Sequence, residues 1–296
     1  SIDVAQIYAQ LALSMTGDKP VTLTLLGDIQ AASRNYQAAI ETYDSVAADS
    51  VLRTNAETEI AVNLQRLEKP AEAEQRLRAV VAREPKNYDV LVTLGNLLRN
   101  NENYKDAEPI YSQALALVPK PERQHWSVFY YRGISRERLK TWPDAEADFR
   151  KALELAPDES SVLNYLGYSL VDMNQKLDEA VDMIKKAVEA KPNDGYIVDS
   201  LGWAHFQLGA FEDAVVQLER AVDLRAGDPI IAEHLGDAYW RVGRKLEAKF
   251  QWQHAKDNKP EPDDLKRIEG KLLNGMPDLP PPVKPADNGG TGGNNG

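Results

Sequence analysis

The chain has 296 residues, of which 43% are hydrophobic and 27% charged, with a net charge of −11 and no cysteine. Its apolar runs are shorter than the roughly 18 residues that a membrane-spanning helix requires, so this segment is not expected to enter a bilayer. The lack of cysteine excludes disulfides, thiolate metal sites and cysteine nucleophiles. An acidic chain without a Lys/Arg-rich run also lacks the basic patch by which proteins bind nucleic acids.

The first predicted element is a helix over residues 3–15, DVAQIYAQLALSM. Ala5, Ala9 and Ala12 share one face of this helix, because residues three and four positions apart lie on the same side. Its large apolar residues would need a covering neighbour. We therefore expect further helical sequence upstream.

From residue 20 to 261 the sequence predicts seven helix-turn-helix repeats. A glycine returns inside the first helix of nearly every repeat, although glycine costs about 1 kcal/mol relative to alanine in a helix. Such a recurrence indicates a repeated packing requirement. These positions, called marks below, are Gly27, Ala61, Gly95, Gly133, Gly167, Gly202 and Gly236.

The second helix of each repeat carries a small residue and, four positions later, a large one. The small residues are Ala39, Ala73, Ala107, Ala145, Ala180, Ala214 and Ala248. The large residues are Tyr43, Leu77, Tyr111, Phe149, Ile184, Leu218 and Trp252. We expect the small residues to let the two helices approach closely, with the large side chain filling the space beside them.

Residues 262–275 form a predicted capping helix after the last repeat, with Leu265, Ile268 and Leu272 on its apolar face. Residues 276–296 are rich first in proline and then in glycine and asparagine. This composition is typical of disordered segments.

The repeated pattern resembles the tetratricopeptide repeat (TPR) family. Residues 90–119, VLVTLGNLLRNNENYKDAEPIYSQALALVP, and 196–224, YIVDSLGWAHFQLGAFEDAVVQLERAVDL, carry it almost whole. The resemblance implies an all-α fold, a right-handed superhelical α-solenoid of helix-turn-helix repeats with a C-terminal capping helix. Residues 1–19 would then hold the second helix of a truncated repeat, and residues 20–261 the seven repeats.

Motifs for catalysis are not found in the sequence. It contains no phosphate-binding loop, nucleophile-elbow or zinc-protease pattern. Its four histidines have no ligand spacing. We therefore expect no catalytic residue, metal or cofactor, and a protein that is not an enzyme.

The resemblance implies a binding groove, because the first helices of such arrays line a concave face. Tyr and Trp provide large contact areas with polar tips, as in binding hot spots. The acidic residues on this face are expected to favour a partner segment that carries Lys or Arg. The alternative is that Tyr168 and Trp203 only pack against neighbouring helices. The groove residues predicted by register are Tyr130, Asn164, Tyr168, Tyr196, Asp199, Trp203, Glu233 and Asp237.

One partner class of the family is disfavoured by the sequence. Cochaperone members bind a C-terminal carboxylate with Lys, Asn and Arg on this face, and no Lys or Arg accompanies the single Asn here. The matching positions are Thr24, Asp28, Thr58, Val62, Val92 and Asn96.

The sequence most resembles the C-terminal half of large bacterial cell-envelope TPR proteins, which include outer-membrane lipoproteins that act as adaptors for periplasmic processing proteases. This resemblance implies a protein-binding scaffold in the periplasm or anchored to the outer membrane, with a protease or its substrate as partner. Any signal or lipid anchor would lie upstream. A cytoplasmic location and the oligomeric state stay open. The alternative function is a regulatory region of a longer enzyme whose catalytic domain precedes residue 1.

Overall fold

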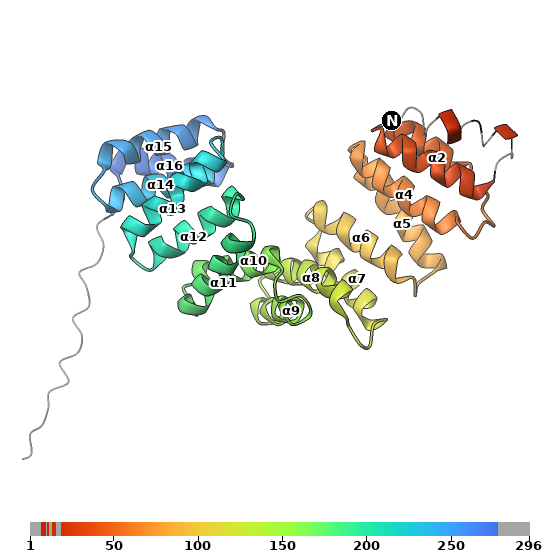
Figure 1. Ribbon diagram of the computed structural model, residues 1–296, viewed down its shortest axis with the longest axis horizontal. Coiled ribbons are helices and arrows are strands. Elements are labelled where there is room, and N and C mark those ends of the chain that lie inside the picture. The colour runs from red at the N-terminus through yellow and green to blue at the C-terminus, as the bar shows by residue number, and fades with distance from the viewer. Residues whose placement is uncertain (1–6, 10, 12–13, 16–18, 278–296) are drawn as a thin grey trace, which may run out of the picture. The chain divides into compact units, whose positions relative to one another are not determined.

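The computed structural model describes residues 7–9, 11, 14–15 and 19–277. Most of the predicted helix 3–15, and the predicted tail from residue 278 onward, lie outside these residues. Every regular element in the described part is helical, with no strand (Figure 1). The all-helical TPR solenoid class predicted from the sequence is confirmed. Within the described residues, no helix is both long and apolar enough to span a bilayer.

The chain folds into two compact units, Ser1–Val162 and Leu163–Gly296. Unit 1 contains four helix pairs, and the helices of each pair pack against each other. The pairs are α2 (Pro20–Ala32) with α3 (Tyr36–Asp44), α4 (Arg53–Arg66) with α5 (Pro70–Arg83), α6 (Tyr88–Asn100) with α7 (Tyr104–Ala116), and α8 (Trp126–Arg138) with α9 (Trp142–Leu155). A short 3-10 helix, η1 (Arg123–His125), precedes α8.

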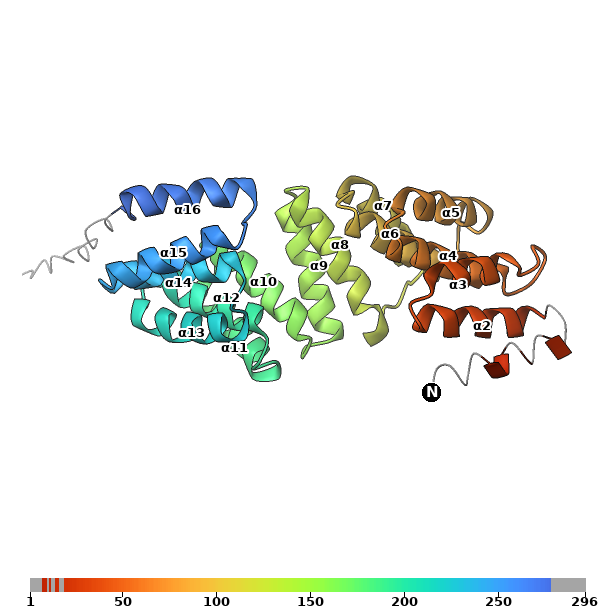
Figure 2. The ribbon, with the colours of Figure 1, turned by 90° about the horizontal axis from the view of Figure 1, so that it is seen from above.

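In unit 2, consecutive helices likewise pack against each other in pairs. Its last helix, α16, lies alongside α15 (Figure 2). The elements are α10 (Ser160–Asp172), α11 (Leu177–Ala190), α12 (Gly195–Gln207), α13 (Phe211–Leu224), α14 (Pro229–Arg241), α15 (Lys245–Asp257) and α16 (Pro262–Asn274).

The packing predicted inside each repeat is confirmed. All seven small residues of the second helices are fully buried, and so are the seven large ones. A methyl group added to Gly202 would lie 2.5 Å from Cγ of Leu218, and one added to Gly236 would lie 2.5 Å from the Trp252 ring. Six of the seven marks are therefore glycine because the large side chain of the second helix occupies the space of a Cβ atom.

Each turn between the two helices of a repeat contains a residue in the left-handed conformation, seven positions after the mark. Left-handed backbone is unfavourable for residues with a Cβ atom, yet only the last two repeats use glycine there. The seven positions are Arg34, Glu68, Glu102, Lys140, Asn174, Gly209 and Gly243.

The type of residue that directly follows each mark, polar or apolar, depends on the large residue of the second helix. Where the large residue has a polar tip, it donates a hydrogen bond to this position, as from Tyr43 Oη to Asp28 Oδ1 (2.6 Å). Tyr111 donates to Asn96 (2.8 Å) in the same way. In the four repeats whose large residue is apolar, the residue directly after the mark is Val62, Ile134, Tyr168 or Trp203. Asp28 and Asn96 therefore accept hydrogen bonds from side chains of the same chain.

Candidate functional site

The predicted groove residues occupy related positions on the first helices. Asn164, Asp199 and Glu233 lie three residues before their marks, on α10, α12 and α14. Tyr168 and Trp203 directly follow their marks. Because residues four positions apart share a helix face, these two rows belong to one surface of unit 2.

Tyr130 lies apart from this set, on α8 of unit 1. Its ring is half-buried among other aromatic rings, with centroids 5.3 Å from Tyr131, 6.0 Å from Trp126 and 6.1 Å from Phe149. Burial raises the pKa of the Tyr130 hydroxyl to about 12, and Tyr131 contributes. Packing within unit 1 therefore accounts for much of the Tyr130 side chain.

Asp199 is buried and paired. One of its carboxylate oxygens lies 2.9 Å from Nδ1 of His234, and the two residues are 6% and 7% exposed. Burial lowers the pKa of His234, but Asp199, with help from Asp237 and Glu233, raises it more, so that the net shift is upward. His234 is not among the groove residues predicted by register, although its position on α14 is one residue from Glu233.

Glu233 and Asp237 are covered by α16. Arg267 donates to both Glu233 oxygens at 2.7 and 2.6 Å, and Lys271 donates to Glu233 and Asp237 at 2.6 Å each. Glu233 is 1% exposed and Asp237 3%. Burial alone would raise the pKa of Glu233, but these two cations lower it, whereas burial prevails for Asp237, whose pKa is raised.

These contacts bear on the expectation that this acidic face attracts a basic partner, because cations of the same chain already occupy it. With His234 protonated, the three positive charges of His234, Arg267 and Lys271 balance the three carboxylates. The acidic residues are already paired within the chain, so their fields do not add at an open surface. The carboxylates concerned are Asp199, Glu233 and Asp237.

Trp203 packs against two neighbouring rings. Its indole stacks on His234, with centroids 4.1 Å apart, and on Phe206, at 4.8 Å. Its buried Nε1 has no hydrogen-bond partner in the described part of the chain. Trp203 is half-buried, so part of the ring stays accessible.

Tyr196, Tyr168 and Asn164 keep accessible surface in unit 2. Tyr196 is 48% exposed, and the guanidinium of Arg225 lies 4.4 Å from its ring centroid. Tyr168 is half-buried, and burial, together with Asp199, raises the pKa of its hydroxyl to about 12. Asn164 is also half-buried, and its buried Oδ1 accepts no hydrogen bond from the described residues.

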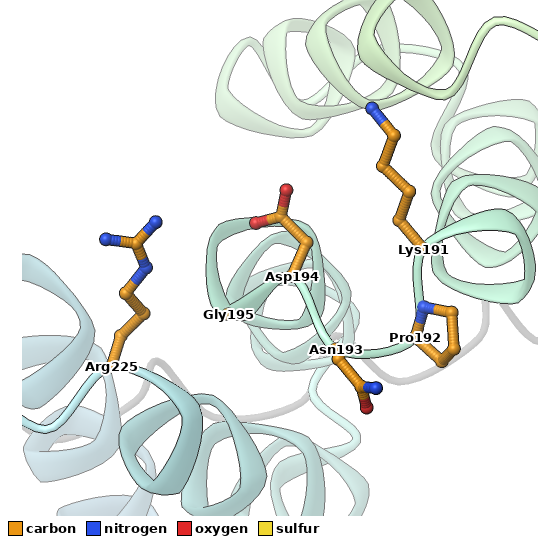
Figure 3. A pocket seen from close by; sticks show the side chains of 6 residues that line it. All are labelled: Lys191, Pro192, Asn193, Asp194, Gly195 and Arg225. Carbon is orange, nitrogen blue, oxygen red and sulfur yellow. The ribbon is translucent and has the colours of Figure 1, made fainter. Parts of the chain in front are cut away.

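A shallow hollow of about 400 Å³ lies at the turn between α11 and α12, and Arg225 is one of its lining residues. Figure 3 shows Asp194 between Lys191 and Arg225, with all three side chains extending from the backbone to the same side. A hollow of about 560 Å³ lies at the corresponding turn between α5 and α6. The hollow is thus a feature of the turn between repeats, and what distinguishes the copy in unit 2 is the Tyr196–Arg225 pair.

Stacked helix pairs whose first helices share one surface define a helical-repeat scaffold for protein-protein interaction. The chain belongs to the tetratricopeptide repeat family, whose models match residues 64–127, 130–195 and 200–255. Folds built only from these repeats are typically non-catalytic.

Two curated proteins are similar to part of the chain. TPR repeat-containing protein PA4667 of Pseudomonas aeruginosa is 30% identical over 144 residues, which are 48% of this chain and 24% of that protein. Hsp70-Hsp90 organizing protein 2 of Arabidopsis thaliana is 26% identical over 179 residues, which are 60% of this chain and 29% of that protein. The chain thus spans about a quarter of the length of each relative.

Solved structures share the fold. A tetratricopeptide repeat protein from Parabacteroides merdae superposes with a TM-score of 0.68 at 18% identity, covering 85% of this chain and 98% of that one. The TPR protein TTC0263 of Thermus thermophilus gives 0.53 at 21% identity, covering 63% of this chain and 100% of its own. At these identities the likeness concerns the fold alone.

Proposed function

We propose that the chain is a non-catalytic adaptor that binds a protein or an extended peptide on unit 2. The observation that carries this proposal is the exposed Tyr196 ring under Arg225, whose side chain also lines the hollow of Figure 3. Tyr and Arg are enriched among the residues that dominate binding energies. An aromatic ring that is 48% exposed and held under a guanidinium offers a partner a rigid apolar surface with polar edges.

Tyr168 and Asn164 would extend this contact along the first helices. The tyrosine supplies area and a hydroxyl, and the half-buried Asn164 side chain adds polar surface beside it. Charge steering would contribute little, because the carboxylates of α12 and α14 are paired internally. The bound segment is therefore expected to be held by apolar contact and hydrogen bonds.

The setting we propose is the bacterial cell envelope, in the periplasm or anchored to the outer membrane, with a processing protease or its substrate as partner. Support for the envelope comes from the sequence resemblance to envelope TPR proteins alone, and the similarity to a Pseudomonas aeruginosa protein supports only a bacterial source. Fractionation of the producing cells tests the setting. Recovery of the protein only in the cytoplasm would overturn it.

The binding proposal is tested with the full chain as bait. A partner captured from the envelope fraction should dissociate faster from Tyr196→Ala, with an affinity loss of about 30-fold, corresponding to a hot spot of roughly 2 kcal/mol. Val216→Ser is the matched control, because Val216 is 61% exposed on the second helix α13. Equal affinity of both variants, with unchanged melting temperatures, would show that Tyr196 is not in the recognition surface.

A further inference from the structure

Helix α16 occupies the place of a first helix in an eighth repeat. Arg267 follows Glu233 by 34 residues, and Lys271 follows Asp237 by 34. Gly270 follows the mark Gly236 by the same period. A Cβ added to Gly270 would meet no described atom within 4 Å, whereas at Gly236 it would lie 2.5 Å from Trp252. Thus α16 packs on the preceding repeat but has no second helix of its own among the described residues.

The apolar attachment of α16 centres on Ile268, which joins the core cluster that contains Trp252 and Tyr239, with Leu272 packed against it. Ile268 is the single buried side chain of the described helix, and Leu265 and Leu272 are half-buried. Leu273 is 81% exposed. Most of the directed contacts from α16 to α14 are the ion pairs of Arg267 and Lys271, called the basic pair below.

The surface beneath the basic pair requires positive charge. Glu233 and Asp237, called the acidic pair below, are 1% and 3% exposed under α16. A buried carboxylate without a cation is strongly unfavourable, so a neutral or acidic helix would be a poor replacement for α16. The structure thus holds a helix with two cations one turn apart, seated on two carboxylates one turn apart.

The connection to α16 differs from those between the other repeats. In the described chain, Lys259 is the only left-handed residue in a turn between consecutive repeats, with φ of 55°. The connection spans residues 258–261 and includes Pro260. Left-handed backbone is disfavoured for a residue with a Cβ atom. Dissociation of α16 from α14 would therefore allow Lys259 to leave this unfavourable conformation.

We propose that the acidic pair on α14 is a docking site for a basic helix of a partner protein, and that α16 occupies this site as an exchangeable internal ligand. The partner helix carries two Arg or Lys residues four positions apart with an apolar residue beside them, the pattern of Arg267, Ile268 and Lys271. This site is separate from the Tyr196 surface and goes beyond the function proposed above.

The test uses the full chain and a labelled synthetic peptide with the sequence of residues 262–275. Ile268→Ser in the chain removes the buried apolar contact of α16 and leaves the acidic pair intact. We expect this variant to bind the peptide at least tenfold more tightly than the wild-type chain. A peptide with Gln in place of both members of the basic pair should bind neither chain. Leu273→Ser, at an exposed position of α16, should behave as wild type.

Hydrogen exchange makes the result decisive even if Ile268→Ser perturbs folding. Saturating peptide should accelerate amide exchange of residues 262–274 in the wild-type chain and leave residues 229–257 protected. Faster exchange throughout unit 2, or unchanged exchange of α16 at millimolar peptide, would overturn the proposal. Equal binding of the basic and Gln-substituted peptides would overturn it as well.

Discussion

The indole of Trp203 lies nearly parallel to the imidazole of His234, with 15° between the ring planes and 4.1 Å between their centroids. This contact joins α12 to α14 whether or not a partner is bound. Trp203→Ala should therefore destabilise unit 2 by about 2 to 3 kcal/mol, less than truncation of a fully buried tryptophan. Urea unfolding measures the change. An unchanged midpoint would show that the stacked ring contributes nothing to stability.

Substitution by leucine is expected to have opposite effects on stability at Gly202 and at Gly270. Gly202→Leu should overpack the contact with Leu218 and destabilise the fold by about 1–3 kcal/mol. Gly270→Leu meets no described atom within 4 Å of its Cβ, and it should stabilise α16 by up to about 1 kcal/mol through helix propensity. Thermal melts of both variants test the pair. A loss of similar size in both would mean that clash does not explain the marks.

The packing inside each repeat could be predicted from the sequence because its partners recur at a fixed spacing. Gly202 and Leu218 are 16 positions apart, and the same spacing serves several other repeats. The charge balance at Glu233 was missed because α16 was interpreted only as a cap. Arg267 follows Glu233 by one further period of 34 residues. The repeat spacing in the sequence therefore places it beside that carboxylate.

Other contacts of the candidate site could not be predicted from the register. The stacking of Trp203 on His234 depends on side-chain rotamers, which packing selects. The pairing of Tyr196 with Arg225 depends on the path of the turn after α13. A register places a residue on a face, but it does not decide whether that residue is exposed.

The left-handed position in the turns provides a stabilising substitution. Glu102 has φ of 59°, and Glu102→Gly should relieve this conformation and stabilise the fold by about 0.5–1 kcal/mol after the entropy cost of glycine. Gly209→Ala is the matched control, because its φ is 76° and no described atom lies within 4 Å of the added Cβ. It should destabilise by about 1 kcal/mol. Changes of the same sign in both variants would contradict this explanation.

The hydrogen bond between Tyr43 and Asp28 predicts coupled substitutions. Burial, followed by this hydrogen bond, raises the pKa of Tyr43 far above its usual value. Tyr43→Phe should destabilise by about 1 kcal/mol. Combining it with Asp28→Val gives the apolar match found at Val62 and Leu77, so the double variant should lose less than the sum of the single losses. A double-mutant cycle by urea unfolding measures the coupling, and strict additivity would show that the two residues do not interact.

His234 predicts how the stability of unit 2 depends on pH. Burial lowers its pKa, whereas Asp199 on α12 and Asp237 and Glu233 on α14 raise it, and the cations Arg267 and Lys271 of α16 pair with the last two carboxylates. Because the folded pKa is raised, the folded state binds the proton more tightly than the unfolded state. The resulting stability is fully present below the unfolded pKa of about 6.5 and is lost as pH rises through the folded pKa.

His234→Gln should remove this dependence. The free energy of unfolding of the wild-type chain should exceed that of the variant most at pH 6, and the excess should shrink toward pH 9. His205 is the control, because burial lowers its pKa: its penalty is present at low pH and disappears above about pH 6.5. His205→Gln should therefore change the slope in the opposite direction. If the difference in the free energy of unfolding between wild type and His234→Gln stays constant from pH 6 to 9, His234 does not carry the third positive charge of the cluster.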